Sequence, residues 1–287
     1  MFGSFLIFFL ITSQILLPLS QGNVLAEKKE LGPVRKINDI VDLKLSSDSA
    51  VAVDFDSGKI LYDKKMNKLR PIASVTKLLT SLVFLDEKPD FAKDFWLISQ
   101  DQVEGGKIYV SLGEKLKVRD LFYASLVGSA NNATLALVRS TGLSTKEFVE
   151  KMNDKAQSLG MKNSYFKEPT GLSEENVSTV QDLVLLAKAA LSNQTIIKAL
   201  MTDEYVFKTA AANEHKIKNT DKLISSEYFN ILGGKTGYTE EAGYCLVTLG
   251  EVCGKKIITV VLGAVSAQDR FQDTKALYWW VEQNYEW

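Results

Sequence analysis

Residues 70–85 have the sequence Arg-Pro-Ile-Ala-Ser-Val-Thr-Lys-Leu-Leu-Thr-Ser-Leu-Val-Phe-Leu, in which Ser74 precedes Lys77 by three positions. Apolar residues after the lysine recur at three- and four-residue spacing, which predicts a helix that begins near the serine. Positions i and i+3 share one face of a helix, so the serine would be a nucleophile beside its own base. The motif alone is more typical of a serine that caps a buried helix and of a lysine on its surface.

Two further motifs favour the catalytic interpretation. Ser129-Ala130-Asn131 and Lys235-Thr236-Gly237 each occur once, in this order, and Gly233-Gly234 precedes the second. The gaps between the motifs are long enough to bring separate elements to one cleft. Together the three motifs describe an acyl-transfer site.

Each motif residue has a chemical use. Lys77 must be neutral to accept the Ser74 proton, and burial together with a second cation, Lys235, would lower its pKa. Ser129 could carry a proton to the leaving group, although it could also be a helix cap. Asn131 offers an amide that both donates and accepts hydrogen bonds. The glycines at 233, 234 and 237 would let a strand edge approach a substrate backbone, or else form a bulge.

Other arrangements are disfavoured. A second Ser-x-x-Lys, residues 164–167, is followed by Pro169 and begins no helical pattern, which indicates a decoy. The single histidine, His215, lies in a polar stretch and is interpreted as a solvated surface residue. Cys245 and Cys253 are too far apart in one strand to be bridged, so we expect two free thiols with packing roles. No metal site or cofactor is implied.

Length and composition are those of one large domain, or of a domain with an inserted lobe. The chain has 287 residues, 46% of them hydrophobic, and a formal net charge of −1. This charge balance gives no indication of a nucleic-acid partner.

The N-terminus is typical of an exported protein. An apolar run covers residues 5–19, and Val24-Leu25-Ala26 offers a signal-peptidase site before charged sequence begins. Residues 1–26 are therefore a predicted signal peptide, or an uncleaved N-terminal anchor, since no Lys or Arg precedes Lys28. Residues 27–46 are predicted to be a polar linker.

The remaining pattern predicts an α+β fold in which an antiparallel sheet is flanked by helices and carries an inserted all-helical lobe. The predicted domain covers residues 47–287, with a sheet lobe at about 47–73 and 201–287 and a helical lobe at about 74–200. Strands are expected at Ala50–Asp54, Lys59–Tyr62, Tyr228–Leu232, Ala242–Leu249 and Lys256–Val265. Helices after the Ser74 helix are expected at Leu116–Val127, Ala133–Val138, Lys146–Leu159, Val180–Leu191 and Asp269–Asn284.

The motifs resemble those of the penicillin-binding serine D-Ala-D-Ala carboxypeptidases, whose fold is β-lactamase/transpeptidase-like. The similarity runs from about residue 47 to the end of the chain. Within this range, and in addition to the three motifs, the similar segments are residues 56–62, 71–78, 159–161, 169–172, 178–183 and 237–244.

This resemblance implies a role for each matching residue. Ser74 would be the acylated nucleophile, Lys77 its base, and Ser129 and Asn131 the proton relay and substrate support. The substrate-binding group would further comprise Lys235, Thr236, Gly237, Tyr238 and Arg270. Backbone N–H groups of residues 74 and 238 would form the oxyanion hole. The arginine would bind the terminal carboxylate through its fork, or else lie on the surface at a helix start.

The resemblance also implies the partners and leaves alternatives. The substrate would be a peptidoglycan stem peptide ending in D-Ala-D-Ala, β-lactams would inhibit, and no cofactor would be needed. Many relatives carry a further β domain and a C-terminal anchor. Neither is expected from residues 47–287, so any membrane attachment is expected to depend on residues 1–26. Glu168-Pro169 resembles the glutamate-proline of class A β-lactamases, although Thr170-Gly171-Leu172 fits the carboxypeptidases better. A class A-like β-lactamase and a non-catalytic murein-binding relative remain the alternatives, and the intact Ser74, Lys77 and Lys235 disfavour the latter.

Overall fold

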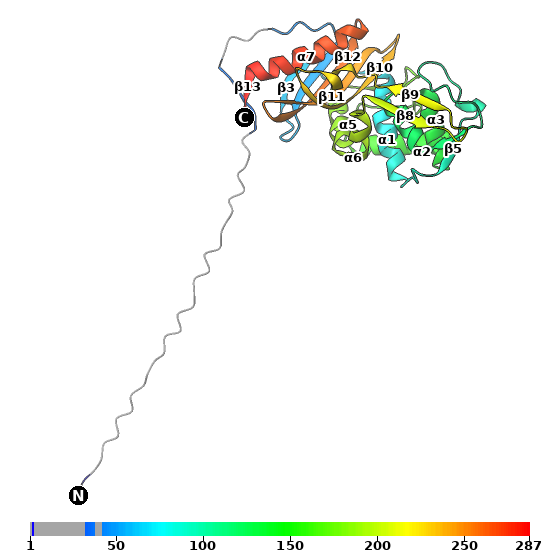
Figure 1. Ribbon diagram of the computed structural model, residues 1–287. Coiled ribbons are helices and arrows are strands. Elements are labelled where there is room, and N and C mark those ends of the chain that lie inside the picture. The colour runs from blue at the N-terminus through cyan, green and yellow to red at the C-terminus, as the bar shows by residue number, and fades with distance from the viewer. Residues whose placement is uncertain (1, 3–31, 38–41) are drawn as a thin grey trace. The chain divides into compact units, whose positions relative to one another are not determined.

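The structure is a computed structural model that describes residue 2, residues 32–37 and residues 42–287 (Figure 1). The predicted signal peptide or anchor, apart from residue 2, lies outside the described residues. So do residues 27–31 and 38–41 of the predicted linker.

A five-stranded antiparallel sheet of order β10-β11-β12-β2-β3 forms the centre of the fold. Its strands are β2 (Ser49–Asp54), β3 (Ile60–Lys64), β10 (Asn230–Thr239), β11 (Gly243–Val252) and β12 (Lys255–Ala264). Every residue of β2 is buried. Val51 and Val53 belong to one apolar cluster and Ala50 and Ala52 to another, because alternate side chains of a strand point to opposite faces. The sheet is therefore covered on both sides.

Helices cover the two faces of this sheet. The helices are α1 (Thr76–Asp86), α2 (Val118–Leu126), α3 (Asn131–Ser140), α4 (Thr145–Ser158), α5 (Val180–Ser192), α6 (Gln194–Leu200) and α7 (Ala267–Asn284). Helix α7 packs along one face, where Leu277 and Tyr278 join the cluster of Ala50 and Ala52. Helix α5 packs on the other face and connects the sheet to α1 and the remaining helices (Figure 1). The predicted α+β architecture is confirmed.

Short elements complete the fold. The part of the chain that the structure describes also contains two-stranded pairs: β1 (Val34–Arg35) with β13 (Tyr285–Glu286), β4 (Arg70–Pro71) with β7 (Val177–Ser178), β5 (Asp94–Trp96) with β6 (Lys115–Lys117), and β8 (Glu204–Lys208) with β9 (Glu214–Lys218). It also contains the short 3₁₀ turns η1 (Ala73–Val75), η2 (Ser99–Asp101) and η3 (Lys222–Ser225). The inserted lobe is therefore mainly, and not entirely, helical.

The β8–β9 hairpin differs most from the sequence-based expectation. It was expected within the sheet lobe, but its strands pair only with each other, and it lies against α2. Tyr205 stacks on Tyr123 at 4.2 Å between ring centroids and donates a hydrogen bond to Asp120. His215 stacks on Phe207 at 5.1 Å and is half-buried, so its interpretation as a solvated residue is wrong. Aromatic packing against α2 thus places this hairpin with the helices.

Both cysteines are free thiols, as predicted. Cys245 is fully buried in β11, whereas Cys253 is exposed in the turn between β11 and β12. The packing role predicted for Cys253 is therefore wrong.

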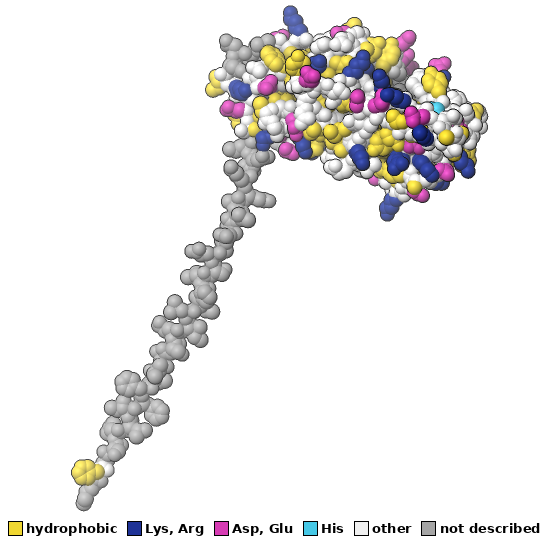
Figure 2. All heavy atoms as spheres, in the orientation of Figure 1, with side chains coloured by type: hydrophobic (Ala, Val, Ile, Leu, Met, Phe, Trp, Pro, Cys, Tyr) yellow, Lys and Arg dark blue, Asp and Glu magenta, His cyan; other side chains and the backbone are white. Residues whose placement is uncertain are grey.

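The described residues include no single helix with the length and apolarity of a membrane span, and only α5 with α6, bent by 97° at their junction, meets that test as a pair. On the face drawn in Figure 2, basic and acidic side chains are interspersed, as expected for a net charge of −1.

Candidate active site

Ser74 and Lys77 lie at the start of the first long helix. Ser74 is in the 3₁₀ turn η1 and Lys77 in the first turn of α1, so the chain turns tightly before the regular helix begins. Lys77 Nζ donates a hydrogen bond to Ser74 Oγ at 2.8 Å. The serine is half-exposed and the lysine fully buried, which leaves the nucleophile accessible and the amine shielded from water. The predicted pairing of the two side chains is present.

Two further acceptors fix the Lys77 amine. It donates to Asn131 Oδ1 and to the backbone carbonyl of Thr170, each at 2.6 Å. Burial lowers the pKa of Lys77 to about 7, although the negative charge of Glu168 opposes this shift. A neutral amine that donates to Asn131 and Thr170 would direct its lone pair at Ser74 Oγ, which is the geometry of a general base.

Ser129 and Lys235 form a second serine–lysine pair. Lys235 Nζ, 1% exposed as a residue, donates to Ser129 Oγ at 2.9 Å and to the Thr236 carbonyl at 3.0 Å. Burial, followed by the charges of Lys77 and Arg270, holds the pKa of Lys235 well below its usual range. The helix that follows is capped by Ala130 without a side-chain hydrogen bond, so Ser129 is not a helix cap.

Two residues of the site have left-handed backbone without being glycine. Ala73, immediately before the nucleophile, has φ +47°, and Ser129 has φ +56°. Such conformations are costly for residues with a Cβ and occur mostly where the surrounding structure enforces them, often at functional sites. Both serines of the site are thus displayed by constrained backbone.

Asn131 connects the helices to a neighbouring loop. Its Oδ1 accepts from Lys77, and its Nδ2 donates to the Glu104 carbonyl at 2.8 Å. Its backbone N–H donates to the Gly106 carbonyl at 2.6 Å. The side-chain amide therefore holds Lys77 and also has a remaining N–H for a substrate.

Each of the three glycines before and within the third motif is required by a different feature of the structure. Gly233, with φ +142°, follows a register shift between β10 and β11, so it forms the expected bulge. A Cβ at Gly234 would lie 2.2 Å from Asp221 Oδ2. A Cβ at Gly237 would lie 3.1 Å from Ser74 N, so β10 passes directly beside the nucleophile. The predicted close approach of a strand edge is present at this last position.

Thr236, Tyr238 and Arg270 lie around the end of β10. Thr236 is 4% exposed and donates from Oγ1 to Thr220 Oγ1 at 2.6 Å. Arg270, near the start of α7, reaches across to donate to the Gly237 carbonyl at 3.1 Å, so it belongs to the site and not to the outer surface. Tyr238 is 51% exposed and stacks on Tyr244 at 4.2 Å, which leaves its backbone at the rim beside the nucleophile.

Glu168 organises a loop beneath Ser74. Its carboxylate accepts from the Thr170 N–H and Oγ1, the Gly171 N–H, the Ser173 N–H and Asn176 Nδ2, at 2.6–3.3 Å. The same loop supplies the Thr170 carbonyl that holds Lys77. The sequence singled out residues 168–172 but not the roles of the Thr170 and Glu104 carbonyls, because a backbone acceptor has no residue signature. A glycine at position 171 agrees with the structure, where this residue has φ +86°.

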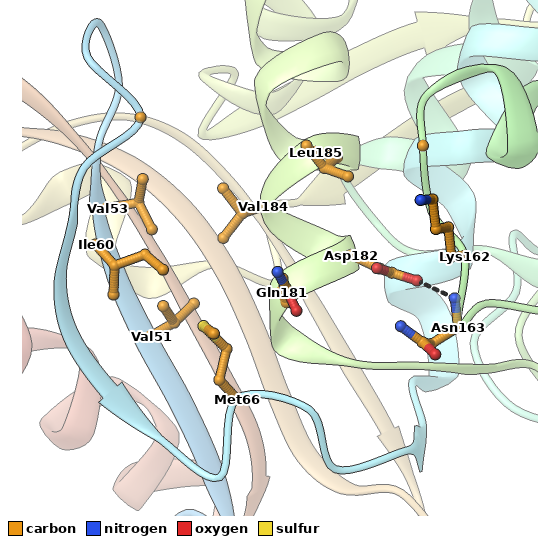
Figure 3. A pocket seen from close by; sticks show the side chains of 12 residues that line it. Val51, Val53, Ile60, Met66, Lys162, Asn163, Gln181, Asp182, Val184 and Leu185 are labelled. Carbon is orange, nitrogen blue, oxygen red and sulfur yellow. Dashed lines mark hydrogen bonds between the residues drawn. The ribbon is translucent and has the colours of Figure 1, made fainter.

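A cavity of about 400 Å³ lies elsewhere, between β2, β3 and α5, and none of the predicted site residues lines it. Figure 3 shows apolar walls from Val51, Val53, Ile60, Met66, Val184 and Leu185, opposite Lys162, Asn163, Gln181 and Asp182. Asp182 accepts a hydrogen bond from the Asn163 N–H at 2.7 Å, and Ser164 also donates to it. Ser164 therefore supports the chain before α5, and its motif is the decoy that the sequence predicts.

A family model decides the relationship of this chain to known proteins. The model of peptidase S11, described as D-alanyl-D-alanine carboxypeptidase, matches residues 36–266. The chain belongs to this family.

Curated relatives agree with membership of peptidase S11. A D-alanyl-D-alanine endopeptidase of Pseudomonas aeruginosa is 36% identical over 245 residues, which cover 83% of this chain and 78% of that protein. The D-alanyl-D-alanine carboxypeptidase DacF of Bacillus subtilis is 35% identical over 243 residues, which cover 82% of this chain and 62% of that protein. This S11 chain is accordingly a serine-type peptidase, as the resemblance implied.

Solved structures confirm the β-lactamase/transpeptidase-like fold of this S11 chain. The Streptomyces K15 DD-transpeptidase matches with a TM-score of 0.79 at 27% identity, covering 84% of this chain and 98% of that one. Penicillin-binding protein D2 of Listeria monocytogenes, in its cefotaxime-bound form, matches with a TM-score of 0.74 at 30% identity, covering 84% and 98%.

Proposed function

We propose that this S11 chain is a D-alanyl-D-alanine carboxypeptidase that removes the terminal D-Ala from peptidoglycan stem peptides through an acyl-enzyme on Ser74. One observation carries the proposal. A fully buried lysine amine lies 2.8 Å from Ser74 Oγ, while a second buried lysine holds Ser129 at 2.9 Å. This combination supplies a nucleophile, its base and a second hydroxyl for proton transfer.

Acylation begins with proton transfer from Ser74 Oγ to neutral Lys77. The oxygen attacks the carbonyl of the penultimate D-Ala, and an Oγ–C bond forms. The resulting oxyanion is stabilised by the backbone N–H groups of Ser74 and Tyr238. The close approach of Gly237 to Ser74 N supports this role, because it brings the two chain segments together.

Collapse of the intermediate breaks the peptide bond. The proton held by Lys77 passes through Ser129 to the leaving nitrogen, and D-Ala departs as a neutral amine that then takes its solution charge. A water molecule gives its proton to Lys77, attacks the acyl carbon and releases Ser74, which regains its proton. Lys77 thus returns to the neutral form at the end of each cycle.

The substrate carboxylate is bound by Lys235, Thr236 and Arg270. Lys235 and Thr236 belong to β10, and Arg270 donates to the carbonyl of Gly237, the next residue of that strand, which supports this assignment. Charge-assisted hydrogen bonds of this kind are stronger than neutral ones and fix the orientation of the peptide. β-Lactams, which also carry a carboxylate beside an acyl group, are proposed to acylate Ser74 and inhibit.

The proposed location is outside the cytoplasm, in the cell wall or periplasm, where the peptidoglycan substrate lies. Residues 1–26 would direct export, and membrane attachment would depend on them if they are not cleaved.

Endopeptidase activity is the second candidate, because several relatives at 34–36% identity carry that name. The same acyl-enzyme would form, but the leaving amine would belong to a second, cross-linked peptide. The class A-like β-lactamase is less favoured, since the Glu168 carboxylate is fully engaged by its own loop.

The test follows the purified chain by intact mass with and without benzylpenicillin. In parallel, D-Ala release is measured from a diacyl-D-Ala-D-Ala peptide and cleavage is measured on a cross-linked muropeptide dimer. A lasting adduct on Ser74 with D-Ala release supports the carboxypeptidase, and dimer cleavage alone supports the endopeptidase. A fleeting adduct without D-Ala indicates a β-lactamase, and ligand binding without any adduct indicates the non-catalytic relative.

A further inference from the structure

The carboxylate end of the site contains two cationic side chains that are largely shielded from water. Lys235 lies along one side of β10 with its residue 1% exposed, and Arg270 approaches from α7 on the other side. Arg270 Nε is buried without a hydrogen-bond partner among the described residues. Two shielded cations repel each other and lose hydration, so the site needs an anion even before substrate arrives.

Asp221 is placed to be that anion. It is 1% exposed and precedes η3, where its Oδ1 accepts from the Leu223 N–H at 2.9 Å. Its Oδ2 is buried and has no hydrogen-bond partner among the described residues. This oxygen lies against the backbone of Gly234, where an added Cβ would come within 2.2 Å of it. The carboxylate therefore abuts β10 at the residue before Lys235.

The segment that carries Asp221 is hydrogen-bonded both to the Lys235-Thr236-Gly237 motif and to the residue after α2. Thr220 accepts from Thr236 Oγ1 at 2.6 Å and donates its N–H to the Val127 carbonyl at 3.0 Å. The aspartate thus belongs to the wall behind the third motif and near the end of α2. Its position is set by the same contacts that set the position of Thr236.

Among the described residues, the charged and titratable groups around Asp221 come from β10, α7 and η3. Lys235 of β10 and Arg270 of α7 both act on its charge, and Tyr278 of α7 is influenced by it in turn. Lys222, its neighbour in η3, is exposed to solvent. Burial raises the pKa of Asp221 to about 6 against the opposing effect of the two cations, so at neutral pH most molecules carry the charge. That charge raises the pKa of both Lys235 and Arg270.

We propose that Asp221 is a positioning residue for carboxylate recognition, whose buried charge keeps Lys235 and Arg270 cationic while the site is empty. The inference rests on the proposed function, because it assigns these cations to a substrate carboxylate. Asp221 itself does not touch the substrate. A role limited to capping η3 would use only Oδ1 and would not explain why Oδ2 is buried beside β10 without a hydrogen-bond partner among the described residues.

The test is Asp221→Asn, which keeps an oxygen for the cap and nearly the same volume but removes the charge. The ratio kcat/KM is measured from pH 5 to 10 for a diacyl-D-Ala-D-Ala peptide and for the same peptide with a C-terminal amide. Without the counter-charge, Lys235 should lose its proton more readily. The alkaline limb for the carboxylate peptide should therefore move to lower pH by about one unit. At pH 8 the preference for carboxylate over amide should fall by about tenfold.

Asp54→Asn is the matched control, because Asp54 is also a buried carboxylate with local hydrogen bonds but lies at the end of β2, outside the site. Its pH profile and substrate preference should equal those of the unaltered chain. An Asp221→Asn profile that also equals the unaltered one would overturn the inference. If that variant does not fold, Asp221→Ser, which also keeps a cap oxygen without charge, gives the same comparison.

Failure of the proposed function would appear separately. In that case the unaltered chain would release no D-Ala and form no benzylpenicillin adduct. Penicillin carries a carboxylate, so acylation rates of the variants can be compared even if peptide turnover is absent.

Discussion

Gly171 is the position where one methyl group should disturb the nucleophile most directly. The Glu168 loop presses this glycine against the chain before Ser74, and a Cβ here would lie 2.0 Å from the Ala73 carbonyl oxygen and 2.8 Å from Ser74 N. Gly142 has the same φ of +86°, and a Cβ there would meet no atom within 4 Å. The pair Gly171→Ala and Gly142→Ala therefore separates backbone strain from steric displacement.

The magnitudes follow from these distances. A left-handed alanine should cost each variant about 1–2 kcal/mol in the free energy of unfolding. Gly171→Ala must in addition move the Ala73 peptide until the 2.0 Å contact exceeds 3.0 Å, the practical limit for a Cβ. Because Ser74 follows Ala73 directly, the nucleophile shifts with it. A misplacement of about 1 Å can cost about 100-fold in rate.

Urea unfolding measures the first effect and benzylpenicillin acylation, followed by intact mass, the second. We expect Gly142→Ala to be destabilised yet to acylate at the unaltered rate, and Gly171→Ala to be destabilised further and to acylate about 100-fold more slowly. Equal acylation rates in the two variants would refute the argument that this loop positions Ser74.

Four further outcomes test the site. Ser74→Ala should abolish covalent penicillin labelling, and an adduct that survives in the mass spectrum would exclude Ser74 as the nucleophile. Because Lys77 acts in its neutral form and its pKa is about 7, the acylation rate should rise with pH and reach half its maximum near pH 7. Lys77→Ala should slow acylation by about 10²–10⁴-fold with the fold intact, whereas an unchanged rate would remove its role as base. Glu168→Gln should lower the free energy of unfolding by about 2 kcal/mol, through lost charge-assisted hydrogen bonds. Glu175→Gln, an exposed change in the same loop, should not, and an acyl-enzyme that persists only in Glu168→Gln would instead point to a β-lactamase.

The sequence predicted the parts of the fold whose patterns are long. Strands β2 and β12 are buried on both faces and appear as nearly continuous apolar runs, while α5 and α7 show clear helical spacing. The β8–β9 hairpin was missed because its alternation, with Tyr205 and Phe207 on one face, lasts only five residues among lysines and glutamates. Its place against α2 depends on aromatic stacking that no local pattern encodes.

The parts of the site that consist of motif side chains could be predicted from the sequence. Ser74 and Lys77 pair as helical spacing indicates, and Lys235 lies near Lys77 as the chemistry requires. The direct bond from Lys235 to Ser129 joins residues far apart in the chain, so only the fold reveals it. Asp221 looked like one polar residue among several, because burial of a single carboxylate leaves no trace in composition.

The strand order of the sheet has a consequence for how the molecule is made. Val51 of β2 pairs with Val260 of β12, so the β2–β3 hairpin lacks its partner strand until almost the whole chain has been synthesised. Val34 likewise pairs with Glu286, which is even more distant in the sequence. Contacts this distant in sequence are slow to form, because a long loop must close before they are made. The helices can assemble earlier from local contacts. The nascent chain should therefore present an unpaired edge of β2 to its surroundings, and loss of the last strands should prevent folding altogether.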